Sequence, residues 1–506
     1  MSEAWARVPE LAAQHLLLAI TALVLGIAIA VPLGFWSAHR PAAARVALGF
    51  ASLVQTVPSL ALLALFYPVL LWIGGVPALG FLPSLLALTL YALLPILRNV
   101  VTGLQGLDPA VVEAANGIGM TRWQKRRLVE APLVLPLAMA GIRTAAVWTI
   151  GAATLSTTVG QPSLGDLIFA GLQTQSWPLV LAGCIAAAGL ALGVDALLGL
   201  AQYGVATRRR WIAAASLALL GLATLAATTP LWRSGADRTV VIGAKNFSEQ
   251  YILARLIGDR LRAAGYEVAY RDGLGSAVAF GAVAGNTIDV YVDYAGTIWT
   301  GPMKRSDVPP RADQVRAITD WARDTHDVTL LGPLGFENAY AFAMRSADAR
   351  RLNIASLDDL VTHAPALALG ADLEFLDRPE WAAVRRAYPL RFASMTPYSP
   401  TFMYRAVASG RADVISAFSS DGRIAADRLT VLSDPKRAIP GYDAILLVAP
   451  RRRDDAALLD ALRPLVGRIP VEAMREANYM VDRDTDKVSP EAAAAWLDRK
   501  ITGAAR

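Results

Sequence analysis

Four aromatic residues lie at the ends of strand-like stretches in the second half of the chain, and their ring faces suit the binding of a cation. Tyr294 ends IDVYVDY, Tyr340 lies in FENAYAF, Phe418 ends ADVISAF and Tyr442 precedes DAILLV. Each desolvated contact between a ring face and a cation contributes roughly 0.5–2 kcal/mol. A quaternary ammonium suits such a box best, because it carries charge but has no N–H donor that needs a partner. The alternative is that the rings pack in the core, and the sequence alone leaves this open.

The elements that must position these rings alternate between strand and helix patterns. Helical spacing of apolar residues predicts a helix that Ser248 caps and Gly265 ends. The alternation predicts open, parallel-type sheets with helices on both faces, and residues 239–506 suffice for two lobes. Ligands in such folds bind at the carboxyl ends of strands, often between lobes. The predicted strands are TVVIGA, YEVAYRDGLG, TIDVYVDYAG, PALALG, ADVISAFSS and AILLVAP.

The pattern of chemical side chains argues against an enzyme and against a metal site. His326 and His363 are single and far apart, and the lone Cys184 lies in an apolar run. No Ser/His/Asp or Cys/His constellation is evident, and the run from Ser419 to Asp421 fits a turn better. We therefore expect no catalytic residues, no metal and no cofactor in this chain.

The chain also lacks a phosphate-binding loop. The string nearest to one, GTIWTGPMK, has Pro302 where a lysine is required. Any ATP and magnesium would therefore be bound by a separate ATPase subunit.

The charged residues are distributed very unevenly along the chain. Residues 1–232 hold only 19 charged side chains, whereas residues 233–506 hold 71. Most of the net charge of +6 lies in the apolar part. A nucleic-acid binder concentrates its positive charge on a soluble face, so this distribution argues against a nucleic-acid partner. It indicates a membrane-embedded part followed by a soluble part.

The first part reads as about six membrane spans, since a span needs about 20 apolar residues. Lysine and arginine are concentrated in alternate loops, which share one side of the membrane. The positive-inside rule places those loops in the cytoplasm. The N-terminus and everything after the sixth span are then expected outside. The predicted spans are 14–36, 47–73, 80–101, 133–158, 178–204 and 211–232, and the basic loops are 37–46, 98–132 and 207–210.

Three ionisable residues, His15, Arg143 and Asp195, lie within or near the predicted spans. Such groups can mark a transport pathway. They can also lie at interfaces or face neighbouring helices, and the sequence favours this second interpretation over a transport role. Prolines at 58, 68, 83 and 95 interrupt the second and third spans, which suits a translocation pore without proving one.

The long basic loop contains LDPAVVEAANGIGMTRWQKRRLVEAPLVLP, from residue 107 to 136. Asp108 followed by Pro109 predicts a helix start. By its residues alone the segment could equally be an amphipathic helix on anionic lipid. The loop resembles the coupling motif of importer permeases of the ATP-binding cassette (ABC) superfamily, in which a short helix docks on the cytosolic ATPase. The matching positions are Glu113, Ala114, Ala115, Gly119 and Pro132, and Ala131 stands where leucine is usual.

The second part resembles the osmoprotectant-binding proteins of the glycine betaine/carnitine/choline family. The resemblance rests on KNFSEQYIL, GLGS, IDVYVDYAGT, FENAYAF, SSDGRI and PGYDAILLV, in that order. In that family a box of tyrosines holds the trimethylammonium head, and polar side chains orient the tail. Arg423 could pair with a carboxylate tail or form a surface or hinge ion pair. The implied substrate-binding residues are Tyr294, Thr297, Asn338, Tyr340, Phe418, Tyr442 and Gln250, with phenylalanine at 418 where tyrosine is usual.

Together the resemblances imply a fused permease and substrate-binding subunit of an ABC importer for quaternary ammonium solutes. The implied fold is an all-α polytopic permease followed by a two-lobed α/β domain of the type II periplasmic-binding-protein kind. A homodimer in the bacterial inner membrane is expected, with the binding domain outside and a cytosolic ATPase as partner. The expected boundaries are 1–210 for the permease with its coupling loop at 107–132, 211–238 for a tethering helix and linker, and 239–506 for the binding domain, with lobe I at about 239–335 and 430–506 and lobe II at about 336–429.

Two other classes stay open. An importer for a different cargo, such as a cationic amino acid, would place an acidic partner near the α-amino group and an arginine near the carboxylate. A transmembrane sensor would need a cytoplasmic output domain, and the longest expected cytoplasmic stretch is only the loop at 98–132.

Overall fold

The computed structural model describes residues 5–73, 76–174, 176–228, 239–372, 375–398, 400–483 and 485–503. The chain divides into two compact units, one formed by residues 1–172 and 176–235 and the other by residues 173–175 and 236–506. Each unit has its own core, and each is described by itself below.

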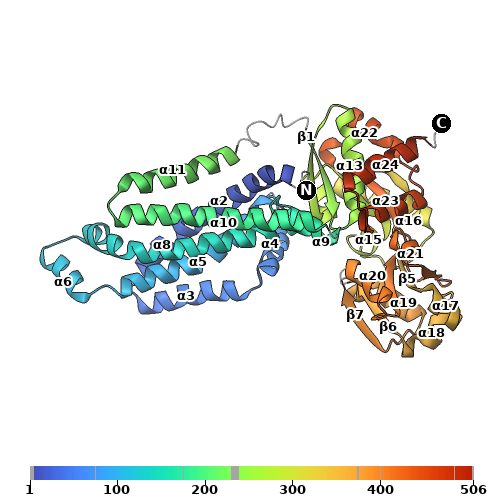
Figure 1. Cartoon of the computed structure of the whole chain (residues 1–506), viewed down its shortest axis with the longest axis horizontal. Helices are drawn as coiled ribbons and strands as arrows, with labels where there is room; N and C mark the ends of the chain where they lie inside the picture. Colours follow the sequence, from blue (N-terminus) through green and yellow to red (C-terminus); the bar gives the residue numbers. More distant parts are fainter. Residues whose placement is uncertain are drawn as a thin grey trace. The chain divides into compact units, whose positions relative to one another are not determined.

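The first unit is a bundle in which α5 packs against α2 and α8, and α8 packs against α10 (Figure 1). A Cβ atom at Gly26 would lie 2.8 Å from the Cβ of Ala92, and one at Gly34 would lie 2.6 Å from Val100. These two glycines therefore let α2 and α5 approach closely. The helices are α2 (Val8–Ser37), α3 (Pro41–Thr56), α4 (Ser59–Ile73), α5 (Phe81–Gln105), α6 (Pro109–Gly117), α7 (Arg122–Lys125), η1 (Arg126–Glu130), α8 (Ala131–Ala153), η2 (Thr154–Val159), α9 (Gly165–Gln173), α10 (Trp177–Ala206) and α11 (Arg210–Ala227).

Within the described residues, five helices are long and apolar enough to cross a membrane, and one bent pair would make a sixth span. The predicted second span, 47–73, is this pair: α3 and α4 meet at an angle of 101°. Val57 is extended there because the following Pro58 disfavours helical backbone at the residue before it. Residues 229–232 of the predicted last span lie outside the described residues.

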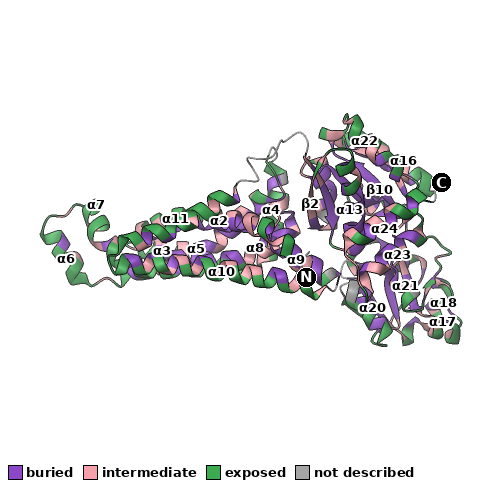
Figure 2. Ribbon diagram, turned by 45° about the horizontal axis from the view of Figure 1, so that its top comes forward, coloured by how far each residue is buried: buried purple, intermediate pink, exposed green. Residues whose placement is uncertain are grey.

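The segment from α6 to η1 lies at one end of the bundle, beyond the ends of α3 and α5 (Figures 1 and 2). Asp108 begins α6 as predicted, since its Oδ1 accepts a hydrogen bond from the N–H of Ala110 over 2.9 Å and Pro109 follows. Lys125 Nζ donates to Asn116 Oδ1 over 3.1 Å and ties α7 to α6.

The second unit contains two five-stranded sheets, each with helices around it. Its strands are β1 (Thr239–Lys245), β2 (Glu267–Leu274), β3 (Val290–Tyr294), β4 (Thr329–Glu337), β5 (Tyr340–Arg345), β6 (Ala368–Asp372), β7 (Ser394–Tyr398), β8 (Val414–Phe418), β9 (Leu429–Leu432) and β10 (Asp443–Val448). Its longer helices are α13 (Ser248–Ala263), α14 (Ser276–Ala284), α15 (Ala295–Thr300), α16 (Arg311–His326), α17 (Ser346–Leu352), α18 (Leu357–His363), α19 (Pro379–Ala387), α20 (Pro400–Ala408), α22 (Ala456–Leu462), α23 (Val471–Asp482) and α24 (Pro490–Gly503), with α21 (Arg423–Ala426) and the 3₁₀ turns η3 (Ala364–Ala366), η4 (Phe375–Asp377), η5 (Pro450–Arg452) and η6 (Arg463–Leu465) between them.

The sheets are mixed, which corrects the expectation of parallel-type sheets. The first sheet has the order β2-β1-β3-β10-β4, and the second has the order β7-β6-β8-β5-β9. In the first, β10 runs antiparallel to both β3 and β4, and in the second β5 runs antiparallel to both β8 and β9. The chain crosses between the lobes twice. The strand that follows each crossing, β5 or β10, runs antiparallel to its neighbours in the sheet that it joins. This is the two-lobed type II periplasmic-binding-protein fold.

The two crossing segments lie side by side. The first crossing joins β4 to β5 through Asn338, and the second joins β9 to β10 through Tyr442. The N–H of Asn338 donates to the carbonyl of Tyr442 over 3.0 Å. Because β9 pairs with β5, the return to the first lobe lies between Leu432 and Asp443, later than the predicted position near 430.

The start of α13 differs from the expectation. Ser248 is the first residue of the helix rather than its cap, and its hydroxyl donates to Asp482 Oδ1 over 2.5 Å. Gly265 ends the helix as predicted, with a positive φ of 89° that favours glycine.

Candidate solute-binding site

Three of the four predicted aromatic rings lie together. Tyr340 begins β5 and stands directly opposite Phe418, which ends β8, and their ring centroids are 5.1 Å apart. The ring of Tyr442 meets Tyr340 edge-on at 5.9 Å. Tyr340 and Tyr442 are buried and Phe418 is half-buried. The register of two antiparallel strands and the adjacent crossing segment therefore assemble these rings.

Tyr294 is attached to this cluster through polar groups. Its ring stacks on Phe247 with centroids 6.1 Å apart, and its hydroxyl donates to Glu249 Oε1 over 2.6 Å. Asn338 Nδ2 donates to the same carboxylate oxygen over 3.0 Å. Burial raises the pKa of Tyr294 well above its ordinary value, so the hydroxyl stays a neutral donor.

The other two predicted residues lie beside Tyr294. Gln250 Nε2 donates to the Tyr294 hydroxyl and to the carbonyl of Val292, over 3.0 Å each, so Gln250 positions the tyrosine. Thr297 is half-buried on α15, next to Gly296. A Cβ at Gly296 would lie 2.4 Å from the ring of Tyr442, so a glycine is needed for that ring to pack here.

Glu249 is a buried carboxylate that the sequence analysis did not select. Asn478 Nδ2 donates to its second oxygen over 2.9 Å, in addition to Tyr294 and Asn338 on the first. Burial raises the pKa of Glu249, and these hydrogen bonds oppose the rise. The sequence showed an acidic residue in the first turn of a predicted helix. It did not show that this turn is buried, or that the partners of Glu249 come from three distant segments.

A second group that the sequence analysis missed surrounds the tyrosine hydroxyls. The guanidinium of Arg378 lies 5.5 Å from the ring centroid of Tyr340, and its Nη2 lies 3.2 Å from Glu380 Oε1. Tyr442 donates its hydroxyl to Glu380, and Tyr340 donates to Asp372 Oδ2 over 3.1 Å. In the sequence, the string DRPEW contains Arg378 and Glu380, but nothing in it indicates that these side chains lie beside Tyr340 and Tyr442.

The charges of this group are stable near neutral pH. Burial disfavours the ionised form of Glu380, but the charge of Arg378 and the hydrogen bond from Tyr442 hold the pKa of Glu380 below its usual value. Burial alone would lower the pKa of Arg378, but the neighbouring tyrosines and Glu380 raise it by more. Arg378 therefore stays charged.

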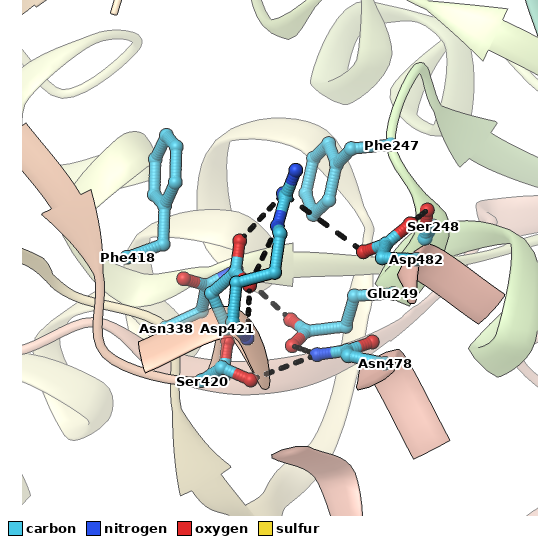
Figure 3. Close-up of a pocket in the computed structure, with 10 residues that line it drawn as sticks. Phe247, Ser248, Glu249, Asn338, Phe418, Ser420, Asp421, Asn478 and Asp482 are labelled. Atoms are coloured by element: carbon cyan, nitrogen blue, oxygen red, sulfur yellow. Dashed lines mark hydrogen bonds and ion pairs between the residues drawn. The ribbon is translucent and has the colours of Figure 1, made fainter. Parts of the chain in front are cut away.

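Phe418 also borders a cavity whose wall comes from both lobes (Figure 3). In this view Glu249 lies between Asn338 and Asn478, and the rings of Phe247 and Phe418 stand above it. The lining residues are Phe247, Ser248, Glu249, Asn338, Phe418, Ser420, Asp421, Arg423, Asn478 and Asp482. The cavity thus continues the aromatic box on its polar side.

Arg423 is an ion-paired residue of this wall. Its Nη2 lies 2.7 Å from Asp421 Oδ2 and 3.9 Å from Asp482 Oδ2. Asp482 belongs to the first lobe and Arg423 to the second. Burial raises the pKa of Asp482 to about 6, and the positive charge of Arg423 limits the rise. One of the two roles predicted for Arg423 was an ion pair, and the structure contains such a pair with Asp421.

The arrangement suits recognition of a small cation. Ring faces attract a positive charge, and the carboxylates of Asp372 and Glu380, which accept from the ring hydroxyls, add to the attraction. Arg378 supplies a half-buried positive group beside the same rings, which suits a carboxylate on the other end of a ligand.

Comparison with known proteins identifies both units. Residues 238–499 match the family described as the substrate binding domain of ABC-type glycine betaine transport system, and residues 30–211 match the binding-protein-dependent transport system inner membrane component. The glycine betaine/carnitine/choline transport system permease protein of Bacillus subtilis is 42% identical over 192 residues, which are 38% of this chain and 85% of that protein. The chain belongs to the ABC importers.

The importer is a permease fused to a substrate-binding domain of the glycine betaine family, a transporter subunit rather than an enzyme. The ergothioneine transport permease/ergothioneine binding protein of Helicobacter pylori is 28% identical over 480 residues, covering 91% of this chain and 84% of that protein. A solved structure described as a glycine betaine/carnitine/choline ABC transporter is 26% identical, with a TM-score of 0.47, and covers 52% of this chain and 98% of its own.

In the importer's permease unit, the predicted coupling residues lie on α6 and just after it. Glu113 and Ala114 are exposed, Ala115 is buried, and Gly119 has a positive φ of 79° that turns the chain. Ile118 is 74% exposed and Trp123 is 70% exposed, so this end of the importer presents apolar side chains to its surroundings.

His15 proves to be a structural residue of the permease. Its Nδ1 accepts from the N–H of Leu164 over 3.2 Å, and its Nε2 lies 2.8 Å from the carbonyl of Ile150. Both ring nitrogens are therefore used in tying α2 to distant parts of the bundle.

Proposed function

We propose that this importer takes up quaternary ammonium compatible solutes, such as glycine betaine, carnitine or choline, by using ATP that a separate cytosolic ATPase hydrolyses. The observation that carries the proposal is the cluster of Tyr340, Phe418 and Tyr442, assembled beside carboxylates in the substrate-binding domain. A methylated ammonium gains from the ring faces and leaves no donor unsatisfied.

The charges beside the box favour a zwitterion among these solutes. The rings and the two carboxylates suit the ammonium end, and Arg378 suits a carboxylate end. A ligand carboxylate would compete with Glu380 for the guanidinium. Glycine betaine and carnitine carry such a carboxylate, whereas choline carries a hydroxyl.

Ergothioneine is the second candidate substrate, and two observations favour it. The relative from Helicobacter pylori that carries this name matches along both units of the chain. The cavity beside Phe418 places hydrogen-bonding side chains, such as those of Asn338 and Asn478, beyond the box, and these suit the imidazole-derived ring of ergothioneine. Its trimethylammonium and carboxylate groups would use the same rings and Arg378.

The remaining parts of the proposal concern assembly. The ATPase docks on α6 around Glu113, Ala114 and Ala115, with Gly119 providing the turn. Two copies form one pore in the bacterial inner membrane, with the binding domain on the extracytoplasmic side. Tethering the receptor gives it a high local concentration, on the order of millimolar for a short linker.

Calorimetric titration of the full chain in lipid nanodiscs tests the substrate. Glycine betaine, carnitine, choline, ergothioneine and arginine are titrated separately under the same conditions. Binding of one or more trimethylammonium compounds, without binding of arginine, is expected. A response to arginine alone would overturn the proposal and support an amino-acid importer instead.

A further inference from the structure

A bidentate ion pair joins two long apolar helices of the permease unit. Arg143 lies near the middle of α8, and Asp195 lies on α10, about three turns before that helix ends at Ala206. Nε and Nη2 of Arg143 donate to the two carboxylate oxygens of Asp195 over 2.8 and 2.7 Å. The distances show a fully formed ion pair, and Arg143 and Asp195 are the only charged residues in the sequences of α8 and α10.

The surface of α10 is shaped to receive the guanidinium. A Cβ at Gly199 would lie only 3.3 Å from Cζ of Arg143, so the arginine lies directly over this glycine. Arg143 Nη1 also lies 3.4 Å from Gln202 Oε1. Asp195, Gly199 and Gln202 share one face of the helix by their spacing, so they form a polar stripe beneath the arginine.

The pair is open on one side. The side chains of Arg143 and Asp195 are 36% and 28% exposed. They line an open hollow together with Ala140, Thr144, Val147 and Trp148, which are exposed on one face of α8. Other faces of α8 pack against α2 and α5, so the hollow faces away from the bundle core.

Such a pair is costly against lipid. Ionisable side chains at mid-depth in a span face protein or a water-filled cavity rather than hydrocarbon. Trp148 and Asp195 moreover combine an aromatic face with a carboxylate, the two groups that attract a methylated ammonium.

We propose that this hollow lines the route of the solute through the permease, and that Trp148 and Asp195 form a passing site for its cationic head. The inference rests on the proposed function for the nature of the cargo. Arg143 already pairs with the carboxylate of Asp195, so the guanidinium competes with the cationic head of the solute for this carboxylate. The affinity of the site for the solute is therefore low. A weak site suits conduction, because the cargo must also leave.

The first test measures water access at the hollow with thiol labelling of the full chain in nanodiscs. Cys184 is first changed to serine, and Thr144→Cys is compared with Leu219→Cys, a control on α11 that is 55% exposed in the wild type. The probes are methanethiosulfonate reagents that carry either a trimethylammonium or a sulfonate group. We expect Thr144→Cys to react about tenfold faster than the control, and to prefer the cationic reagent.

Asp195→Asn should abolish that preference without closing the hollow to water. Equal labelling of Thr144→Cys and the control would overturn the inference, and so would a charge preference that is absent or unaffected by Asp195→Asn. Cross-linking of Thr144→Cys between two copies without labelling would show instead that this face is a subunit contact, which also overturns it.

The second test distinguishes a role of Asp195 in solute passage from a purely structural role, in which the ion pair only holds α8 and α10 together. In proteoliposomes containing the ATPase, Asp195→Asn should lower solute uptake by about tenfold or more while calorimetric binding stays unchanged. The exchange Arg143→Asp with Asp195→Arg rebuilds an ion pair. Recovery of full uptake in this double variant would mean a purely structural role and overturn the inference. Failure of the proposed function would appear separately, as wild-type protein that binds no quaternary amine.

Discussion

Tyr340 and Phe418 stand opposite each other on the antiparallel strands β5 and β8, with ring centroids 5.1 Å apart. The strand register holds both rings before any ligand arrives, so little ordering is left to be done on binding. Tyr442 completes the group from the crossing segment that also binds Asn338. The box therefore lies where the two lobes are joined, and movement of one lobe against the other would act directly on it.

The ring face of Tyr340, rather than its hydroxyl, is expected to dominate ligand binding. Tyr340→Ala should weaken quaternary amine binding by more than about tenfold, because it removes the central ring of the cluster. Tyr340→Phe keeps the ring and loses the hydrogen bond to Asp372, so its effect should be mild. Calorimetric titration of both variants checks this.

The control for that experiment is Tyr388→Phe. Tyr388 also donates its hydroxyl to an aspartate, Asp434, but takes no part in the ring cluster around Tyr340. This variant should bind like the wild type. If Tyr340→Ala and Tyr340→Phe were equally harmless, the assignment of the box would be wrong.

Arg378 is expected to select for a carboxylate on the ligand. Arg378→Gln should weaken binding of glycine betaine by about tenfold or more, with a smaller effect on choline, which has no carboxylate. The matched control is Arg385→Gln, since Arg385 is exposed and lies over Trp381 on the same lobe. Equal losses for both ligands would argue that Arg378 only maintains the structure.

The stability of the binding unit should depend on Asp482 in weakly acidic solution. Its pKa is raised by burial to about 6, whereas an unfolded aspartate titrates near 3.9. Between these values the folded state binds more protons than the unfolded state, so the contribution of Asp482 to stability falls as pH rises. This contribution is fully present below about pH 4 and is lost as pH passes about 6.

Thermal unfolding of the full chain between pH 4 and 7 measures this, through the transition that bound ligand shifts. Asp482→Asn cannot titrate, so the fall in stability with rising pH should be smaller in this variant. The idea fails if the two proteins show the same pH dependence across that window.

Coupling to the ATPase should depend on the exposed face of α6. Glu113→Lys should abolish uptake in proteoliposomes containing the ATPase and leave calorimetric binding unchanged, because α6 and the binding site belong to different units. Glu10→Lys, an equivalent charge change at an exposed position of α2, should transport normally. Joint loss of binding and uptake in Glu113→Lys would point to misfolding.

Local patterns were sufficient for much of the fold. Runs of apolar residues predicted the long helices, and Asp108 with Pro109 marked the start of α6. The bend between α3 and α4 followed from Pro58, although the sequence placed one span across it. The antiparallel strands β5 and β10 were harder, because strand direction depends on where the chain crosses between lobes.

The sequence by itself determined which side chains could bind a cation, because ring chemistry and strand-end positions are local properties. Only the tertiary structure decided which of them meet. Tyr340, Phe418 and Tyr442 gather through strand register, while Tyr294 joins through the carboxylate of Glu249. The roles of Glu249, Arg378 and Glu380 escaped prediction because the tyrosines that they contact lie on distant segments. An ionisable residue is defined by what surrounds it, and that is known only once the chain has folded.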